Sequence, residues 1–295
     1  LSFLKKGDEL LVSENCYEPV FNFCENELKK FGIKTTFFEN NNPEKFRNLI
    51  THNTKIVYLE SPGSINFEVE DIENIVKITK DKKIKTIIDN TWATFLIANP
   101  LKWGIDIAIE SCTKYFSGHS DNFCGIIACN KSDYKKIKQT AVRFGDFVSS
   151  ENCSLALRGL RTLNVRLNKH EENAKKIFKY LKKKEIVHKI LFLPDTNNPS
   201  HKMYKKYFSR SNGLISFAVK KNKKKIEVFI DSLKLFKIGF SWGGYESLIL
   251  PINQIKPTMK KLDDRFFWFR IHIGLESADD LIKDLERGFK NYEKK

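Results

Sequence analysis

The feature that most constrains the fold is the alternation of short apolar runs with helical patterns over the first half of the chain. Apolar runs predict strands at residues 8–13, 33–39, 55–60, 85–89, 105–110 and 125–129. Residues 19–30 and 71–79 lie between such runs and show helical spacing instead. Strands that alternate with helices predict an α/β fold with a mostly parallel, doubly wound central sheet and helices on both faces.

The pattern changes after residue 151. Residues 152–183 contain no proline, which predicts one long helix or two. Strand-like runs follow at 214–219, 235–240 and 266–273, and an amphipathic helix is expected from 277 to about 292. We therefore expect two domains, residues 1–160 around the parallel sheet and residues 161–295 as a smaller α+β domain.

Composition limits the classes of function. The chain of 295 residues has 52 Lys+Arg and 36 Asp+Glu, a net charge of +16. The lysines are spread along the whole sequence, which favours a solvated basic surface over nucleic-acid binding. No apolar run approaches the roughly 20 residues of a membrane-spanning helix. The first residue is Leu and the first segment does not resemble the start of a domain, so we expect an N-terminally truncated chain.

The six cysteines show no C-x-x-C spacing and no histidines at zinc-site distances. Scattered cysteines in a chain of this length are typical of buried thiols, which favours a reducing, cytoplasmic setting without a metal site.

The strongest chemical signal lies between residues 89 and 121. Asp89 ends one predicted strand and Lys114 follows the next, so both side chains are expected at the carboxyl edge of the sheet. They could form a salt bridge. Alternatively, they could form a pyridoxal phosphate (PLP) site, with Lys114 linked to the cofactor, Asp89 paired with its pyridine nitrogen, and Ser111 and Thr113 donating hydroxyls to its phosphate.

A weaker signal is the G-x-S-x-G motif at residues 239–243, which would make Ser241 a hydrolase nucleophile. Its acid and base would be Asp264 and His272. The segment after the motif has a β-like pattern where a nucleophile elbow needs a helix, so this reading is disfavoured.

Longer motifs, in order along the chain, resemble the cystathionine β-lyase branch of the Cys/Met-metabolism PLP enzymes. They are Tyr58-Leu59-Glu60-Ser61-Pro62-Gly63-Ser64, Asp89-Asn90-Thr91-Trp92-Ala93-Thr94, Thr113-Lys114-Tyr115, Arg158-Gly159-Leu160-Arg161-Thr162-Leu163 and Ser241-Trp242-Gly243-Gly244-Tyr245-Glu246-Ser247. The resemblance implies a fold-type I PLP-dependent transferase fold with PLP as cofactor.

The resemblance also implies roles for single residues. Lys114 would be the Schiff-base lysine and proton shuttle, and Asp89 the partner of the pyridine nitrogen. Tyr17 would stack on the cofactor ring as a catalytic and cofactor-binding residue. Arg270 would bind the substrate α-carboxylate through two parallel donors, with Ser241 and Trp242 shaping that pocket. Without the resemblance, Tyr17 would be a half-buried aromatic and Arg270 a surface residue on an edge strand.

The implied reaction is β-elimination of L-cystathionine to homocysteine, pyruvate and ammonia, a step in transsulfuration towards methionine. The implied assembly is a homodimer or homotetramer whose other partner is a small sulfur amino acid. Relatives that act as γ-lyases or γ-synthases share most of these residues, so γ-chemistry is the alternative. The family's upstream Tyr-x-Arg pair and glycine-containing phosphate turn do not occur in this sequence. An inactive lyase fragment is therefore also considered.

Overall fold

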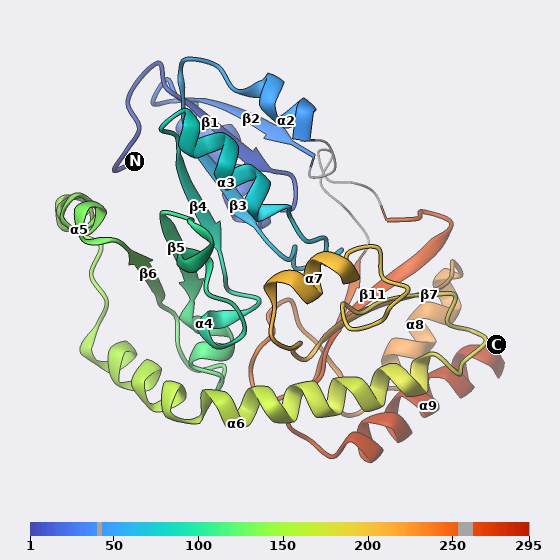
Figure 1. Ribbon diagram of the computed structural model, residues 1–295. Helices are drawn as coiled ribbons and strands as arrows, with labels where there is room; N and C mark the ends of the chain where they lie inside the picture. The colour runs from blue at the N-terminus through green and yellow to red at the C-terminus, as the bar shows by residue number, and fades with distance from the viewer. Residues whose placement is uncertain (40–42, 253–261, 295) are drawn as a thin grey trace.

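A computed structural model describes residues 1–39, 43–252 and 262–294 and contains two sheets (Figure 1). The first sheet has the strand order β2-β1-β3-β4-β5-β6. All of its pairings are parallel except that of β5 with β6. The prediction of a mostly parallel sheet is confirmed. Its strands are β1 (Glu9–Ser13), β2 (Lys34–Phe38), β3 (Thr54–Glu60), β4 (Lys85–Asp89), β5 (Ile107–Ser111) and β6 (Gly125–Cys129).

Apart from α5, the helices of this half are short. They are α1 (Glu18–Phe23), η1 (Cys24–Leu28), α2 (Pro43–Leu49), α3 (Ile72–Asp81), α4 (Thr94–Ile97), η2 (Pro100–Trp103), η3 (Cys112–Phe116) and α5 (Lys131–Phe144). In α3, Ile72, Ile75 and Val76 are buried, as the spacing of three and four residues predicts. The helix expected over 19–30 divides into α1 and the π-helix η1.

The second sheet has the order β7-β8-β11-β10-β9, with β11 at its centre. Its strands are β7 (Lys189–Leu191), β8 (Leu214–Lys220), β9 (Lys237–Ile238), β10 (Leu248–Ile252) and β11 (Phe266–His272). Its helices are α7 (His201–Tyr207), α8 (Lys223–Asp231) and α9 (Ala278–Lys294). The strands run antiparallel except for β9 with β10.

The strand expected at 235–240 is shorter than predicted. Only Lys237–Ile238 pair as β9. The backbone N–H groups of Leu235 and Phe236 instead donate to the buried carboxylate of Asp284 on α9. Because those donors are already satisfied, they are not available to a sheet neighbour.

The long helix α6 (Ser150–Leu181) joins the two halves and runs along one side of both sheets (Figure 1). Ser149 caps it by accepting a hydrogen bond from the Asn152 N–H. Leu163 and Leu167 pack into the core of the first sheet. Ala174 and Ile177 pack into the core of the second. The boundary expected between residues 160 and 161 falls inside this helix, and the division into domains stays a prediction.

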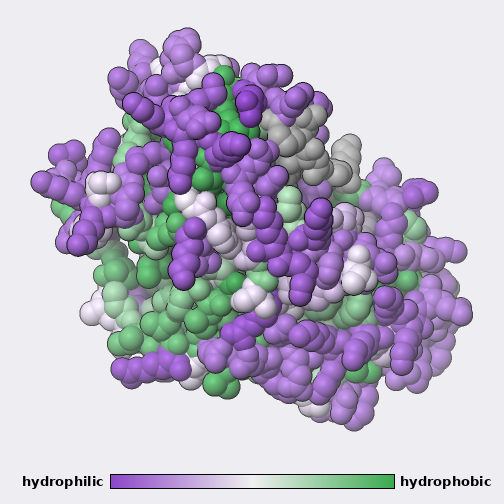
Figure 2. All heavy atoms as spheres, viewed as in Figure 1, coloured by the Kyte–Doolittle hydropathy of each residue, from purple (hydrophilic) through white to green (hydrophobic). Residues whose placement is uncertain are grey.

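Hydrophilic side chains cover most of the face seen in Figure 2. Hydrophobic side chains gather on the side where β6 and the start of α6 lie. Large exposed apolar residues of this region include Phe123, Ile127, Phe147 and Val165. Among the residues that the structure describes, none of the helices combines the length and apolar character needed to cross a bilayer.

Gly159 is the residue at which α6 comes into close contact with the segment after β5. A Cβ at Gly159 would lie 2.3 Å from the carbonyl oxygen of Ser117. In an open helix, alanine is favoured over glycine by about 1 kcal/mol, but overpacking costs about 1–3 kcal/mol. We expect Gly159→Ala to lower the free energy of unfolding, measured by urea denaturation followed by circular dichroism. Lys179→Ala, at an exposed site on the same helix, is the control. Unchanged or higher stability of Gly159→Ala would contradict this packing.

Candidate active site

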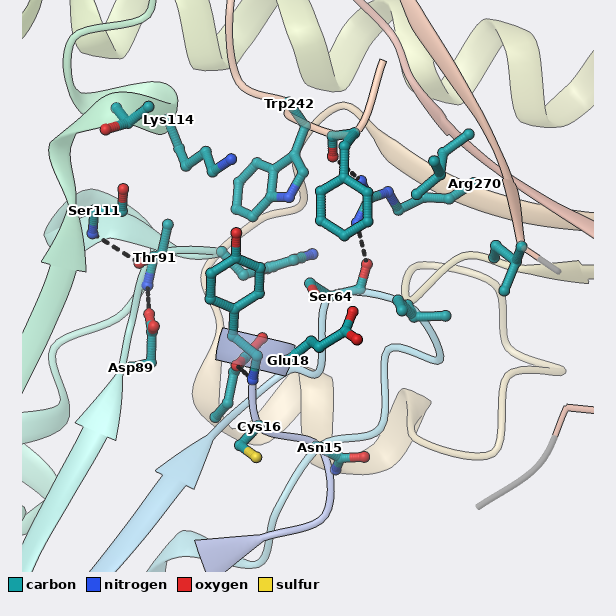
Figure 3. Close-up of a pocket in the computed structure, with 18 of the residues that line it drawn as sticks. Asn15, Cys16, Glu18, Ser64, Asp89, Thr91, Ser111, Lys114, Trp242 and Arg270 are labelled. Carbon is teal, nitrogen blue, oxygen red and sulfur yellow. Dashed lines mark hydrogen bonds between the residues drawn. The ribbon is translucent and has the colours of Figure 1, made fainter. Parts of the chain in front are cut away.

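Both sheets contribute to one cavity of about 530 Å³, which is within the size range of small-molecule sites. Lys114 and Asp89 enter it from the first sheet, and Arg270 enters from the opposite side (Figure 3). Tyr17, Ser111, Thr113 and Trp242 also line it. Ser241 reaches it through a hydrogen bond to Lys114. The structure thus brings together all eight residues that the sequence pointed to.

Lys114 lies in the π-helix η3, directly after β5, in a non-helical conformation (φ −88°, ψ −135°). Its Nζ donates to Ser241 Oγ at 2.7 Å and lies 5.3 Å from the centre of the Trp242 ring. Burial, followed by the nearby charge of Arg270, lowers the pKa of Lys114 to about 8, although Asp89 acts in the opposite direction. A larger fraction of this amine is therefore neutral near pH 7 than of an exposed lysine, whose pKa is about 10.4.

Asp89 is the last residue of β4. Its Oδ1 accepts a hydrogen bond from the Thr91 N–H at 2.8 Å. Burial raises the pKa of Asp89, while the Thr91 hydrogen bonds and the charge of Lys114 oppose that rise. A partly buried carboxylate of this kind gains stability when a cation is placed beside it.

Arg270 lies on β11, the central strand of its sheet, and is 3% exposed. This excludes the alternative of a surface arginine on an edge strand. Its guanidinium donates to the backbone oxygens of Ser64 and Phe240. Both acceptors are neutral, and burial lowers the Arg270 pKa to about 10. The cavity wall therefore presents a cation suited to a carboxylate.

The loop that carries Ser241 and Trp242 lies against the backbone of η3. Gly243 has φ +87°, and a Cβ there would lie 2.6 Å from the Tyr115 nitrogen and 2.8 Å from the Lys114 carbonyl carbon. Glycine is required both by the positive φ and by this contact. The hydrolase reading does not fit this arrangement, because Ser241 Oγ accepts from Lys114 and the His272 ring bonds the Glu246 carbonyl oxygen.

Sequence reasoning missed two residues that organise the site. Thr91 Oγ1 accepts from the Ser111 N–H at 2.8 Å, which ties the end of β4 to the end of β5. Glu60 is buried and accepts a hydrogen bond from the Tyr17 N–H through Oε2, while the Tyr17 side chain stays 41% exposed. Both residues lie inside the motifs quoted above. Their partners are backbone groups, which no sequence pattern identifies.

The donor set fits pyridoxal phosphate. Lys114 supplies an amine of lowered pKa for the aldehyde, and Asp89 supplies a partly buried carboxylate for a protonated pyridine nitrogen. Ser111 and Thr113 line the same cavity and offer hydroxyl groups for a phosphate. Arg270 remains available for the carboxylate of a second molecule.

Comparisons with known proteins agree with this chemistry. The family model described as Cys/Met metabolism PLP-dependent enzyme matches residues 1–290. The chain is 38% identical over 301 residues to the cystathionine beta-lyase of Escherichia coli, covering 98% of this chain and 75% of that protein. It is 37% identical over 289 residues to an L-alanine/L-glutamate racemase of Wolbachia pipientis, covering 97% and 71%.

A solved structure is also similar. The cystathionine gamma-lyase of Lactobacillus plantarum, complexed with L-serine, matches with a TM-score of 0.91 at 30% identity, over 98% of this chain and 78% of that one. This match confirms the expected fold class of PLP-dependent transferases.

The electrostatics of the cavity predict how Lys114 titrates in the cofactor-free chain. Since Arg270 lowers the Lys114 pKa and Asp89 raises it, Arg270→Met should move that pKa above about 8, and Asp89→Asn should move it lower. The measurement is the pH dependence of Lys114 acetylation, read by mass spectrometry, with exposed Lys179 as the internal reference. Shifts in the opposite directions, or none, would refute this account of the cavity.

Proposed function

Because the chain belongs to the Cys/Met metabolism PLP-dependent enzyme family, we propose that it is a carbon–sulfur lyase that cleaves L-cystathionine by β-elimination. The products would be homocysteine, pyruvate and ammonia, which places the reaction in methionine biosynthesis. The observation that carries the proposal is the convergence of Lys114, Asp89 and Arg270 on one cavity. These are a base, a carboxylate for the cofactor ring and a cation for the substrate.

In this proposal, Arg270 binds the α-carboxylate of the substrate and so orients the Cα–H bond. Its neutral acceptors leave its positive charge for that carboxylate. Lys114 Nζ removes the Cα proton as a neutral amine, which its lowered pKa favours. Ser241 Oγ, 2.7 Å from Nζ, directs the amine, and Trp242 forms the adjacent wall.

The bound PLP supplies an electron sink for the electron pair that remains when the Cα proton leaves. Asp89 supports this role by keeping a carboxylate where the ring nitrogen is protonated. Tyr17, which lines the cavity and whose backbone N–H is held by Glu60, would stack on the ring. Ser111 and Thr113 would hold the phosphate, and Thr91 fixes the backbone between them and Asp89.

Two other outcomes have support. The γ-lyase similarity supports cleavage at Cγ, which would release 2-oxobutyrate. The similarity to the Wolbachia racemase supports proton exchange at Cα without loss of a side-chain group, which would yield the D-amino acid. All three reactions begin with removal of the Cα proton, so the product separates them.

We further propose that the chain forms a homodimer or a homotetramer and acts in the cytoplasm. The exposed apolar side chains of β6 and α6, such as Ile127 and Val165, support a covered face in the assembly. The six cysteines, all within the described residues, form no disulfide with one another, which supports a reducing compartment.

Product analysis tests the proposed reaction. With PLP and L-cystathionine, we expect pyruvate and one equivalent of free thiol, measured by lactate dehydrogenase coupling and a thiol reagent. Lys114→Ala, which removes the base, should form neither. Release of 2-oxobutyrate would contradict β-elimination and identify γ-elimination as the reaction. Conversion of L-alanine to D-alanine without keto acid would identify a racemase.

Substrate anchoring by Arg270 makes a second prediction. Arg270→Lys keeps the charge but loses the two parallel donors, which is expected to cost about 1.5–3 kcal/mol, or roughly 10- to 150-fold in kcat/KM. The visible absorbance of the bound cofactor should stay as in the wild type. An unchanged kcat/KM for cystathionine would remove Arg270 from the substrate site.

A further inference from the structure

One face of α6 carries a column of buried polar side chains. Arg166, His170 and Asn173 follow one another at spacings of four and three residues, so they lie on the same side of the helix. Their exposed fractions are 5%, 0% and 0%. We call these three residues the polar column of α6. Buried polar groups need partners, and most of those of the polar column lie on segments far away in the sequence.

Arg166 bonds the segment that carries the pocket lysine. Its Nη1 donates to the Tyr115 carbonyl oxygen at 2.7 Å and its Nη2 to that of Phe116 at 3.2 Å. Within α6 itself, Nη2 donates to the Gly159 oxygen at 2.7 Å and Nε to Thr162 Oγ1 at 3.0 Å. Four hydrogen bonds therefore hold the guanidinium, and two of them reach the residues immediately after Lys114.

The contact between α6 and this segment depends on two glycines. A Cβ at Gly118 would lie 1.9 Å from Arg166 Nη1. A Cβ at Gly159 would lie 2.3 Å from the Ser117 oxygen and 2.5 Å from the Ser117 Cα. Only hydrogen atoms at both positions leave room for the guanidinium between the helix and the turn. The turn after Lys114 and the helix are thus complementary in shape as well as in hydrogen bonding.

The rest of the polar column bonds the segment after β11. His170 Nδ1 lies 2.7 Å from the Ile273 carbonyl oxygen, so that nitrogen carries the hydrogen. Asn173 Nδ2 donates to the carbonyl oxygens of Gly274 at 3.0 Å and Glu276 at 2.8 Å. These acceptors directly follow the strand that bears Arg270. One helix face therefore bonds the backbone next to both chemically important cations of the cavity.

The energetics of Arg166 argue against a role in stability alone. Its acceptors are three backbone carbonyls and a hydroxyl, all of them neutral. A cation buried among neutral groups loses its hydration, and here burial lowers the Arg166 pKa to about 10. An apolar side chain would avoid that loss. Compared with an apolar side chain, the guanidinium adds a rigid, planar set of N–H donors, the charged fork, which bonds carbonyl groups lying in different directions.

We propose that the polar column of α6, and Arg166 above all, is a positioning device that fixes Lys114 relative to Arg270. An α-helix rises about 1.5 Å per residue, so Arg166 and Asn173, which bond the two sets of carbonyl groups, lie about 10 Å apart along one stiff element. Arg166 does not line the cavity. It acts through the backbone of residues 112–118, which we call the lysine turn. The catalytic consequence rests on the proposed function, whereas the structural part does not.

Hydrogen exchange in the cofactor-free chain tests the structural part. The Ser117 N–H bonds the Cys112 oxygen and the Gly118 N–H bonds the Lys114 oxygen, both inside the lysine turn. In Arg166→Ala we expect these two amides to exchange at least about tenfold faster, because the turn loses its hydrogen bonds to Arg166. Arg161→Ala, an exposed arginine of the same helix, should leave them unchanged. Rates within twofold of wild type in a folded Arg166→Ala would overturn the proposal.

Chemical rescue tests whether the charged fork itself is needed. Millimolar guanidinium chloride should slow the exchange of both amides in Arg166→Ala, while equal urea, a neutral molecule of similar shape, should not. If Arg166→Ala does not fold, Arg166→Lys replaces it, with an intermediate exchange rate expected because an ammonium reaches fewer carbonyls. Exchange at Ser117 and Gly118 equal to wild type in Arg166→Lys would overturn the role of the fork.

Kinetics then test the catalytic consequence. A base displaced by about 1 Å loses about 100-fold in rate, so Arg166→Ala should lower kcat by about that factor with KM changed less than threefold. Guanidinium should recover at least tenfold of that loss. If exchange rises but kcat does not fall, the column positions the turn without a catalytic effect, and the catalytic part is overturned. If no variant, including wild type, cleaves cystathionine, the proposed function fails while the exchange data still decide the structural part.

Discussion

The contact between Lys114 and the loop at Ser241–Gly243 joins the two sheets at the cavity. Lys114 follows a strand of the parallel sheet, whereas the loop belongs to the antiparallel sheet, 127 residues later at Ser241. The hydrogen bond from Nζ to Ser241 Oγ and the close approach of Gly243 to the Lys114 backbone require both halves to be folded. The helix α6 packs into both cores and so connects the two halves that make this contact.

The charges of the cavity follow from that geometry. Lys114 is partly buried and lies near a second cation, Arg270, so its protonated form is disfavoured. Asp89 is placed where it opposes this effect, and its own charged form is disfavoured by burial. The cavity is therefore poised for a ligand that brings both a cationic ring and an anionic group. This is the electrostatic reason why the donor set fits PLP and an amino-acid substrate.

Much of this arrangement could be predicted from the sequence, because strand patterning and the strand-end positions of Asp89 and Lys114 are local features. The parts of the arrangement that depend on backbone groups distant in the sequence could not be predicted in this way. The strand expected at 235–240 shortens because Asp284, about fifty residues later, takes its donors. The roles of Thr91 and Glu60 in the site could not be predicted because their hydrogen-bond partners are backbone N–H groups. Gly159 interrupted a helical pattern in the sequence, but in the fold it is the point where α6 meets the Ser117 backbone.

The central claim is that Lys114 is the residue that binds the cofactor. The most direct measurement is borohydride reduction of the chain incubated with PLP, followed by peptide mass spectrometry and visible spectroscopy, with Lys114→Ala as the matched control. We predict an absorbance band in the visible range in the wild type and a reduced phosphopyridoxyl group on the peptide that contains Lys114. The variant should show neither. Labelling of another lysine in the wild type, or equal labelling of Lys114→Ala, would contradict the account.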